Sequence, residues 1–372
     1  MRVALFTECY RPIHNGVVAS VDALRDGLRA HGVEAVTVAP NFPHLYGDPD
    51  DVVRIPSLPL PTATAYRLCV PYLGADERAR LRDISLVHAH SAFVTGWMGA
   101  ALARRRGVPL VFTYHTRLDA YAHYAPFDAA ATQRALVALT RRYANAADVV
   151  VVPTRAIERA LRAQGVVARL VVVPRAIDVA RFAAGRRDAA VRARLGAHGA
   201  EPLVLAVARL GVEKNLELAL DALARAPELR LALVGDGPQR AMLAARAEQL
   251  GLAGRVRFLG ALPPDELPDL YASADAFVFP SVTDTQGLVL AEALAAGLPI
   301  VAAESEVARE VLAGHGRLAP AQAEALAAAL RAAVATGRDQ SAVHLAFSRF
   351  TVEMHAARIL EVYREVLAAR AA

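Results

Sequence analysis

Two cations stand close together in the segment AVARLGVEKN, which covers residues 206–215. Arg209 and Lys214 follow an apolar run that has the pattern of a buried strand, and loops after parallel strands face the ligand crevice. Lys214 is the single lysine of a chain with 41 arginines, which favours a compact ammonium group at this position. Two such cations can hold a diphosphate and neutralise its charge as it leaves, although ordinary surface cations give the same pattern.

A second segment that could carry chemistry is SVTDTQGLVLAEALAAGLPIVA, residues 281–302. It follows the apolar run FVFP, and its spacing predicts a strand, a tight turn containing Asp284 and Gly287, and a helix. The unpaired backbone N–H groups at the start of this helix attract an anion. Glu292 lies one turn further along, where a carboxylate suits sugar hydroxyls better than a phosphate. A capping aspartate and a solvated glutamate would also give this pattern.

The first half of the chain places polar side chains beside expected strands and helices. HNGVV, residues 14–18, puts Asn15 and Gly16 just before a helix, where a phosphate can approach the backbone; by itself it is a common turn. FTYHTRLDAYAHY, residues 112–124, follows a strand and therefore places His115 at the carboxyl edge of a sheet.

Metal binding has weaker support in the sequence. No cysteine or carboxylate spacing accompanies the histidines as a zinc site would require. The Asp48-Pro49-Asp50 segment imitates a metal-binding DxD motif, but it lies in a polar loop and we interpret it as surface. The histidines concerned are His88, His90, His115 and His123.

These loops need strands and helices to hold them. Short apolar runs alternate with helical patterns along the chain, which predicts parallel sheets with helices on both faces. The alternation restarts at Leu203, after a polar, arginine-rich stretch at 181–201. We therefore expect two α/β, doubly wound domains at residues 1–176 and 177–350, with ligands at the carboxyl ends of the strands, and a long closing helix at 351–372.

Composition sets limits on the class of protein. The chain has 372 residues, 55% of them hydrophobic, and two cysteines, so we expect large cores and no disulfide scaffold. The start MRVALFTECY is too short for a signal peptide, and no apolar run reaches membrane-spanning length, so we expect a cytoplasmic protein. Residues 1–176 hold 21 arginines and 14 acidic residues, while the remainder is slightly acidic. This asymmetry is compatible with an anionic membrane surface, and an ordinary solvated surface would also give it. Nucleic acid is a weaker alternative, because the chain has no recognition motif for it.

Several of these segments together resemble one enzyme family. Asp284 and Glu292, with seven residues between them, are similar to the E-x7-E motif of retaining glycosyltransferases of the glycogen-synthase-like clan, and Arg209 and Lys214 match their R-x4-K motif. The resemblance implies the GT-B fold: two Rossmann-like domains facing a cleft, with the closing helix packed back on the first domain. Asp284 replaces the usual glutamate, and Ala176 stands where the family usually has glycine.

The same resemblance implies roles for the residues in the expected second domain. Arg209 and Lys214 would bind the diphosphate and act in catalysis, and Glu292 would bind the nucleotide ribose. Asp284 would bind the transferred sugar and also act in catalysis. LVGDGP, residues 233–238, resembles the glycine turn behind the nucleotide. The remaining donor-binding residues implied there are Gly235, Gly287, Leu288 and Val289.

The expected first domain would supply His115 near the reacting carbon, Asn15 and Gly16 across from the donor, and the acceptor site. TDTQG and TYHTRLDAYAHY resemble diacylglycerol glucosyltransferases, whose donor is UDP-glucose. We therefore expect a metal-independent enzyme without further cofactor, peripheral on the cytosolic face of a membrane, that glycosylates a lipid. The expected acceptor-binding residues are His90, Tyr114, Arg134, Arg141 and Arg142, the three arginines lying in a helical stretch with Leu136, Leu139 and Tyr143.

Three alternatives remain open at this point. A mannosyltransferase that uses GDP-mannose would share much of the same pattern. A hydrolase or a nucleotide-sugar 2-epimerase could use the same fold. A catalytically silent nucleotide-sugar-binding protein would keep the donor site without transfer.

Overall fold

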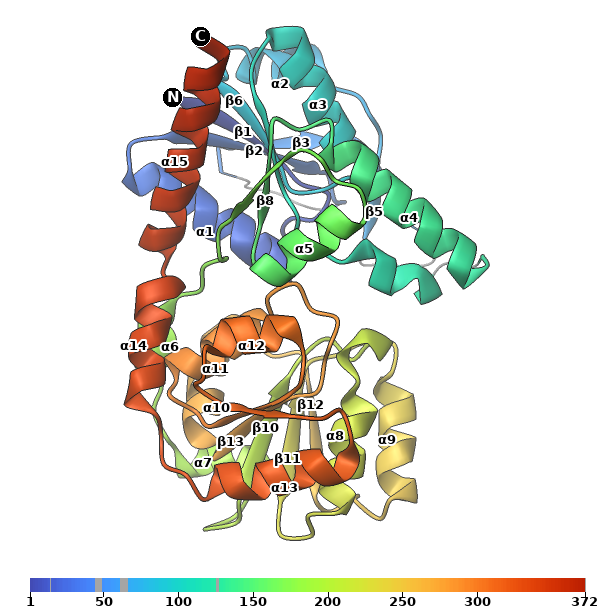
Figure 1. The fold of residues 1–372 in the computed structure, drawn as a ribbon, viewed down its shortest axis with the longest axis vertical. Coiled ribbons are helices and arrows are strands. Elements are labelled where there is room, and N and C mark those ends of the chain that lie inside the picture. Colours follow the sequence, from blue (N-terminus) through green and yellow to red (C-terminus); the bar gives the residue numbers. More distant parts are fainter. Residues whose placement is uncertain (14, 44–48, 61–65, 125–126, 372) are drawn as a thin grey trace. The chain divides into compact units, whose positions relative to one another are not determined.

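The computed structural model describes the whole chain except residues 14, 44–48, 61–65, 125–126 and 372. The chain divides into two compact units (Figure 1). The first unit comprises Met1–Ala176 together with Val352–Ala372, and the second comprises Ile177–Thr351. Among the described helices, none is long and apolar enough to cross a membrane.

The first unit is built on a seven-stranded parallel sheet with the order β3-β2-β1-β6-β7-β8-β9. Its central strands are rich in apolar residues and buried at nearly every position, as strands covered on both faces must be. The strands are β1 (Arg2–Phe6), β2 (Glu34–Pro40), β3 (Val52–Ile55), β6 (Leu86–Ala89), β7 (Leu110–Thr113), β8 (Val149–Val152) and β9 (Arg169–Val172). A separate antiparallel pair joins β4 (Ser57–Pro59) to β5 (Arg67–Cys69).

Helices cover both faces of this sheet. Val3 and Leu5 point to the face that carries α1 and the C-terminal helix α15, whereas Phe6 meets α3 on the other, where a Cβ on Gly99 would lie 3.1 Å from its ring. The helices are α1 (Gly16–Ala30), α2 (Ala75–Arg80), α3 (Val94–Arg106), the 3-10 segment η1 (Leu118–Tyr124), α4 (Ala129–Ala144), α5 (Arg155–Ala163) and α15 (Val352–Ala371).

The closing helix returns to the first unit, as expected. A Cβ on Gly27 of α1 would lie 2.6 Å from the Cβ of Ala356, so glycine allows α1 and α15 to approach closely. Ile359 and Tyr363 of α15 are fully buried in the same apolar core as the strands. Burial of these side chains, rather than sequence proximity, makes the last helix part of the first unit.

The second unit repeats the architecture with a six-stranded parallel sheet in the order β12-β11-β10-β13-β14-β15. Its core on one face combines Val204, Ala206 and Val278 with leucines from the helices packed above them. The strands are β10 (Leu203–Val207), β11 (Arg230–Val234), β12 (Val256–Gly260), β13 (Ala276–Phe279), β14 (Ile300–Ala303) and β15 (Arg317–Ala319).

The arginine-rich stretch at the start of the second unit is ordered, not merely a polar connection. It forms α6 (Val179–Ala183) and α7 (Ala189–Arg194). Arg192 is buried and donates to the carbonyl of Ser273 at 2.7 Å and to Asp275 Oδ2 at 3.0 Å, which satisfies its charge. The other helical segments of the unit are η2 (Val212–Lys214), α8 (Leu216–Ala224), α9 (Arg240–Gln249), η3 (Pro264–Glu266), α10 (Leu267–Ser273), α11 (Leu288–Ala295), α12 (Glu306–Leu312), α13 (Ala323–Val334) and α14 (Gln340–Arg349).

Both sheets reverse their strand order at one point. In the first unit the reversal lies between β1 and β6, and in the second it lies between β10 and β13. Loops that leave neighbouring strands at such a point diverge to opposite faces and open a crevice where ligands bind. A ligand site is therefore expected at the carboxyl ends of β1 and β6 in the first unit and of β10 and β13 in the second.

Candidate active site

The switch point of the second unit brings together two residues that are 70 positions apart in the sequence. Lys214, in the loop after β10, lies with its Nζ 2.7 Å from Oδ1 of Asp284, in the loop after β13. The two side chains are only 19% and 17% exposed. The other oxygen of Asp284, Oδ2, is buried and has no hydrogen-bond partner within the described part of the chain. The carboxylate of Asp284 therefore binds the ammonium group through one oxygen, and its other oxygen remains available to accept a hydrogen bond from a ligand.

Hydrogen bonds to backbone carbonyls lock these two loops against each other. The carbonyl of Glu213 accepts from Ser281 Oγ at 2.9 Å and from Thr283 Oγ1 at 3.0 Å. Asn215, which has a left-handed backbone with φ of 52°, donates from Nδ2 to the carbonyl of Pro280 at 3.2 Å. The position of Lys214 relative to Asp284 is thus fixed by the backbone on both sides.

Arg209 has a different environment from Lys214. Its Nη1 lies 3.4 Å from Oε1 of Glu213, whose side chain is 3% exposed, while the arginine itself is 43% exposed. A buried carboxylate thus anchors an accessible guanidinium. Sequence reasoning did not select Glu213, although it stands inside the R-x4-K segment directly before Lys214.

The glycine turn after β11 supports the same loop from behind. A Cβ on Gly235 would lie 1.9 Å from the carbonyl oxygen of Ala208, and one on Gly237 would lie 2.5 Å from that of Leu210. The turn and the loop also exchange backbone hydrogen bonds, including Leu210 N to the carbonyl of Asp236 at 3.0 Å. Glycine is needed at these positions because the backbone that carries Arg209 passes so close.

The helix α11 begins at the same switch point with an open first turn. Its N-cap is Gly287, with φ of 69°, and this residue makes no side-chain capping hydrogen bond. Leu288 and Val289 form the first turn and are partly exposed. Backbone N–H groups and the helix dipole there favour a negatively charged ligand.

Glu292 lies in the second turn of α11 and is tied to a neighbouring helix. Its Oε2 accepts a hydrogen bond of 2.6 Å from the hydroxyl of Tyr271 in α10. Burial of the carboxyl group raises the pKa of Glu292 to about 7, against the lowering effects of the Tyr271 hydroxyl and of Arg181. No local spacing pointed to Tyr271, because it lies 21 residues before its partner.

The switch region of the first unit has a cluster of buried imidazoles instead of ion pairs. His90 Nδ1 lies 2.8 Å from His115 Nε2, so one of these rings donates to the other. His88 stacks on His90 with ring centroids 4.3 Å apart, and its own nitrogens contact Tyr363 Oη and Thr113 Oγ1, each at 2.6 Å. The contact with Tyr363 connects α15 directly to the histidine cluster.

These histidines are neutral in the folded protein. Burial lowers the pKa of His90 to about 3. It also lowers to about 4 the pKa of His355 in α15, whose Nδ1 lies 2.8 Å from the carbonyl oxygen of Pro174. Burial also holds the pKa values of His88 and His115 well below the usual range, with neighbouring histidines adding to the effect. His115 is 7% exposed, so this cluster can orient hydrogen bonds but supplies no positive charge near neutral pH.

The remaining residues expected in the first unit have mainly structural contacts. Asn15 caps α1, since its Oδ1 accepts from Val17 N and Val18 N at 3.0 Å each. Gly16 is the first residue of that helix, and Tyr114 is buried at 4% exposure with its ring edge-on to Phe112. The structure thus brings His90 and His115 together and buries Tyr114, the residue that directly precedes His115.

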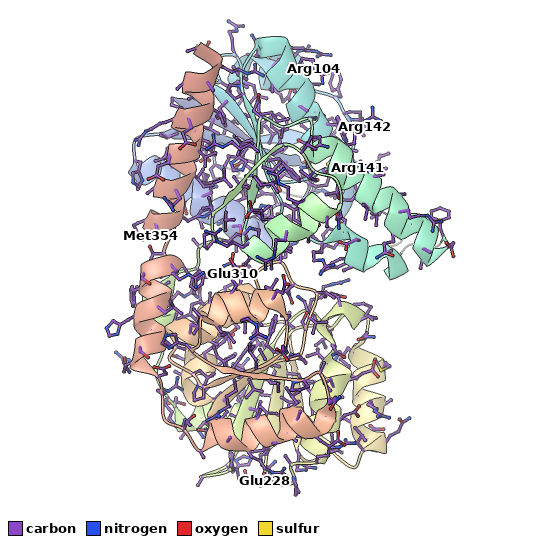
Figure 2. The ribbon with its side chains drawn as sticks, viewed as in Figure 1. Arg104, Arg141, Arg142, Glu228, Glu310 and Met354 are labelled. Carbon is purple, nitrogen blue, oxygen red and sulfur yellow. The ribbon has the colours of Figure 1, made fainter. Side chains whose placement is uncertain are left out.

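The basic side chains of α4 are exposed, whereas Tyr143 of the same helical stretch is not. Arg134, Arg141 and Arg142 are all exposed, and Figure 2 labels the last two along α4. Arg142 lies over the ring of Trp97 at 5.7 Å. Tyr143 is fully buried and donates to the carbonyl of Gly96 at 2.9 Å. It points into the core because aromatic rings of the sheet and α3 surround it.

Within the described residues, no three histidine, cysteine or acidic side chains are grouped to hold a metal ion. Two residues of the motifs weighed for metal binding cannot be placed there. Asp48 and the side chain of His123 lie outside the described part of the structure.

The sequence has relatives of known activity. Residues 188–343 match the family described as Glycosyl transferases group 1, and residues 14–181 match Glycosyltransferase Family 4. A GDP-mannose-dependent alpha-mannosyltransferase from Mycobacterium tuberculosis is 35% identical over 85% of this chain and 82% of its own length. The chain belongs to the glycosyltransferases. An alpha-monoglucosyldiacylglycerol synthase from Streptococcus pneumoniae is 30% identical to this glycosyltransferase over 81% of the chain and 71% of the relative.

Solved structures place the glycosyltransferase in the GT-B fold. Sucrose-phosphate synthase from Thermosynechococcus elongatus superposes with a TM-score of 0.79 and 22% identity, covering 99% of both chains. HepE from Anabaena, in complex with UDP and glucose, gives a TM-score of 0.73 and 22% identity over 98% of this chain and 100% of that one. The two Rossmann-like parallel sheets are those expected from the sequence.

Proposed function

We propose that this glycosyltransferase moves a hexose from a nucleotide-diphosphate sugar to a membrane lipid, with retention of configuration at the sugar carbon. The observation that carries the proposal is the contact between Lys214 and Asp284 at the switch point of the second unit, beside the open first turn of α11. A cation, a partly unpaired carboxylate and helix N–H groups without a side-chain cap are what a sugar joined to a diphosphate requires.

Each part of the donor would meet a different group of this site. The diphosphate would be bound by Lys214, Arg209 and the backbone N–H groups at the start of α11. A sugar hydroxyl would donate to the unpaired Oδ2 of Asp284, and the ribose hydroxyls would donate to Glu292. Because Asp284 already holds Lys214, binding of the diphosphate would exchange one anionic partner of the ammonium group for another.

In this proposal, the reaction proceeds by positioning and by stabilisation of the leaving group. The acceptor hydroxyl attacks the sugar carbon on the face from which the diphosphate departs, and a phosphate oxygen receives the acceptor proton. Lys214 and Arg209 neutralise the charge that develops on the diphosphate, a role for which fixed cations in a partly dry site are effective. The same two cations let the reaction proceed without a divalent metal.

A lipid acceptor is supported by the first unit and by the relatives. Exposed arginines of α4 line a hollow of about 240 Å³ together with Val137 and Ala138. Phe127, just before this helix, is 77% exposed. Arginines beside exposed apolar side chains suit an anionic lipid surface, so we propose peripheral binding to the cytosolic face. The synthases of monoglucosyldiacylglycerol among the relatives favour diacylglycerol as acceptor and glucose as the transferred sugar. UDP-glucose as donor rests on the resemblance of TDTQG and TYHTRLDAYAHY to diacylglycerol glucosyltransferases.

A second candidate reaction is mannosyl transfer from GDP-mannose. It is favoured by three relatives described as GDP-mannose-dependent alpha-mannosyltransferases, which are 30% to 35% identical to the chain. The groups of the site that we assign to diphosphate, ribose and sugar hydroxyl are shared by both donors. They do not separate glucose from mannose.

The test is an assay with labelled UDP-glucose and GDP-mannose, each with diacylglycerol in vesicles and with soluble sugars as acceptors. We expect labelled glycolipid from UDP-glucose, with the α configuration, both with and without EDTA. Label in a soluble sugar alone would contradict the lipid acceptor, and loss of activity in EDTA that manganese or magnesium restores would contradict metal independence. Nucleotide-sugar binding without any transfer would identify a silent binding protein.

A further inference from the structure

The hydroxyl of Tyr271 makes a short hydrogen bond to a carboxylate in the proposed donor site. It lies 2.6 Å from Oε2 of Glu292, and it connects α10 to α11. The other oxygen, Oε1, accepts no hydrogen bond from any residue that the structure describes. One oxygen of Glu292 is therefore held by the protein, and the other is left for a ligand.

The aromatic ring that carries this hydroxyl is held tightly. Tyr271 is fully buried. Its ring stacks on Phe277 of β13 with centroids 5.4 Å apart, and Phe182 of α6 packs edge-on at the same distance. The carbonyl of Tyr271 accepts from Arg338 at 3.1 Å, which also fixes the backbone. The hydroxyl therefore has one position, and it imposes that position on the glutamate side chain.

Packing alone does not explain the hydroxyl. A phenylalanine would fill the same space between Phe182 and Phe277, and a tyrosine that only needed a partner could use a backbone carbonyl. Here the partner is a carboxylate, whose burial costs free energy that one hydrogen bond offsets only in part. A carboxylate with one oxygen fixed and one unpaired is arranged to receive hydroxyl donors.

We propose that Tyr271 is a positioning residue that fixes Glu292 to receive the ribose hydroxyls of a ribonucleoside diphosphate, and that it thereby sets the preference of the site for ribose over 2′-deoxyribose. The inference rests on the proposed function, in which Glu292 binds the nucleotide ribose. It adds a residue that does not touch the ligand but determines how well the site distinguishes the two sugars.

The experiment compares UDP with 2′-deoxy-UDP, and GDP with 2′-deoxy-GDP, by calorimetric titration of the full chain. For the nucleotide that wild type binds, we expect Tyr271→Phe to lose about tenfold in affinity for the ribose form, the size of one hydrogen bond to a charged group. The 2′-deoxy form, which keeps only its 3′-hydroxyl as a donor to Glu292, should lose clearly less affinity, so that the preference shrinks. Turnover at saturating donor should stay within about twofold, because Tyr271 acts on binding.

Two further variants separate positioning from structure. Phe182→Leu disturbs the packing around the same ring, and it should lower the melting temperature while leaving the ribose preference intact. Glu292→Ala should abolish the preference, and adding Tyr271→Phe to it should have no further effect on that preference. These results together would support a role that acts through Glu292.

Two outcomes overturn the inference in distinguishable ways. If Tyr271→Phe weakens the ribose and 2′-deoxyribose forms equally, or weakens neither, the hydroxyl has no positioning role although the donor site stands. If wild type binds neither nucleoside diphosphate, the proposed function fails at its first step and the inference fails with it.

Discussion

The two sheets share one strand order but treat the helix at their switch point in opposite ways. In the first unit, Glu8 lies in the loop that follows β1. Its Oε2 accepts hydrogen bonds from Thr95 N at 2.9 Å and from Thr95 Oγ1 at 2.6 Å, and Thr95 is in the first turn of α3. In the second unit, α11 occupies the equivalent place after β13 and starts at Gly287 without a side-chain cap. The first unit fills its anion-binding position with its own carboxylate, and the second leaves it open.

Charge follows the same division. The switch region of the first unit carries neutral imidazoles packed against one another, whereas that of the second carries Lys214, Asp284, Arg209 and Glu213 in close ionic contacts. Two domains of one architecture can thus divide the work, because fold alone does not decide what a site binds. We expect the second unit to bind the diphosphate and the first to contribute shape and hydrogen bonds.

The largest expected effect is an opposite response of the two regions to acid. The pKa of His90 is lowered to about 3 and that of His355 to about 4, so between those values and about 6.5 the unfolded chain binds more protons than the folded one. The free energy of unfolding of the first unit should therefore fall as pH falls through this window, by about 1.4 kcal/mol per pH unit for each such histidine. Glu292 acts the other way, because its raised pKa of about 7 makes the folded second unit bind more protons between about 4.5 and 7.

The single tryptophan allows this difference to be measured. Trp97 lies in α3 of the first unit, edge-on to the buried ring of Tyr143. The free energy of unfolding in urea, followed by Trp97 fluorescence, should fall by several kcal/mol between pH 7 and about pH 4.5. The value followed by circular dichroism, to which both units contribute, should fall by less. Equal shifts of both signals would contradict the separation of the two sites by charge.

The next largest effect is expected from replacing Lys214, the ammonium group at the switch point of the second unit. Lys214→Ala should lower turnover by about 100-fold or more, the loss seen when one preorganised charge-stabilising group is removed. Lys214→Arg should also be impaired, because a planar guanidinium does not reproduce the compact contact with Asp284 at 2.7 Å. Initial rates at saturating donor test both variants. Wild-type rates in either one would remove Lys214 from catalysis.

Much of the framework of both regions follows from local sequence. The runs that form β10 and β13 are apolar and short, and the glycine ahead of α11 marks a helix start, so the sequence alone places the loops that carry Lys214 and Asp284. The secondary structure of residues 41–84 is harder to predict from the sequence. Its strand β3 is only four residues long and contains Arg54, so its apolar pattern is weak.

The contacts that complete each site could not be predicted, because they join distant parts of the chain. Glu8 meets Thr95 across 87 residues, and Tyr271 meets Glu292 from a separate helix. Such pairs have no spacing signature, since the fold alone brings them together. The burial of Tyr143 has a related reason: it lies in the same helical stretch as the exposed arginines, but rings from other elements of the fold cover it.

A smaller effect is expected from removing the internal cap of the first unit. Glu8→Ala leaves the buried hydroxyl and N–H of Thr95 without their acceptor, which should lower the free energy of unfolding by about 2 kcal/mol. Because the cap belongs to the first unit, affinity for a nucleoside diphosphate should stay within about twofold. Urea unfolding read by Trp97 and calorimetric titration provide the two measurements. A clear loss of nucleotide affinity would mean that this unit, too, takes part in anion binding.

The smallest effect lies on the surface of the first unit and concerns the acceptor membrane. Arg134 is exposed on α4 beside the hollow that it lines, and removing one basic residue near an anionic surface costs about 1 kcal/mol, or roughly fivefold in binding. Arg134→Gln should therefore weaken flotation with vesicles that contain anionic lipid. Arg364→Gln is the matched control, because it removes the same charge from α15, which Figure 1 shows on the side of this unit away from α4.

Salt and lipid composition decide whether this binding is electrostatic. Binding of wild type should rise with the anionic lipid fraction and fall with salt, because a Debye length of about 8 Å at physiological ionic strength confines the attraction to the nearest charges. Arg134→Gln should also reduce the dependence on salt, while Arg364→Gln should leave it as in wild type. Equal losses in both variants would mean that net charge, and not the face of α4, attracts the protein to the membrane. Such a result would leave the donor site of the second unit untouched, since its groups lie on a different unit from either arginine.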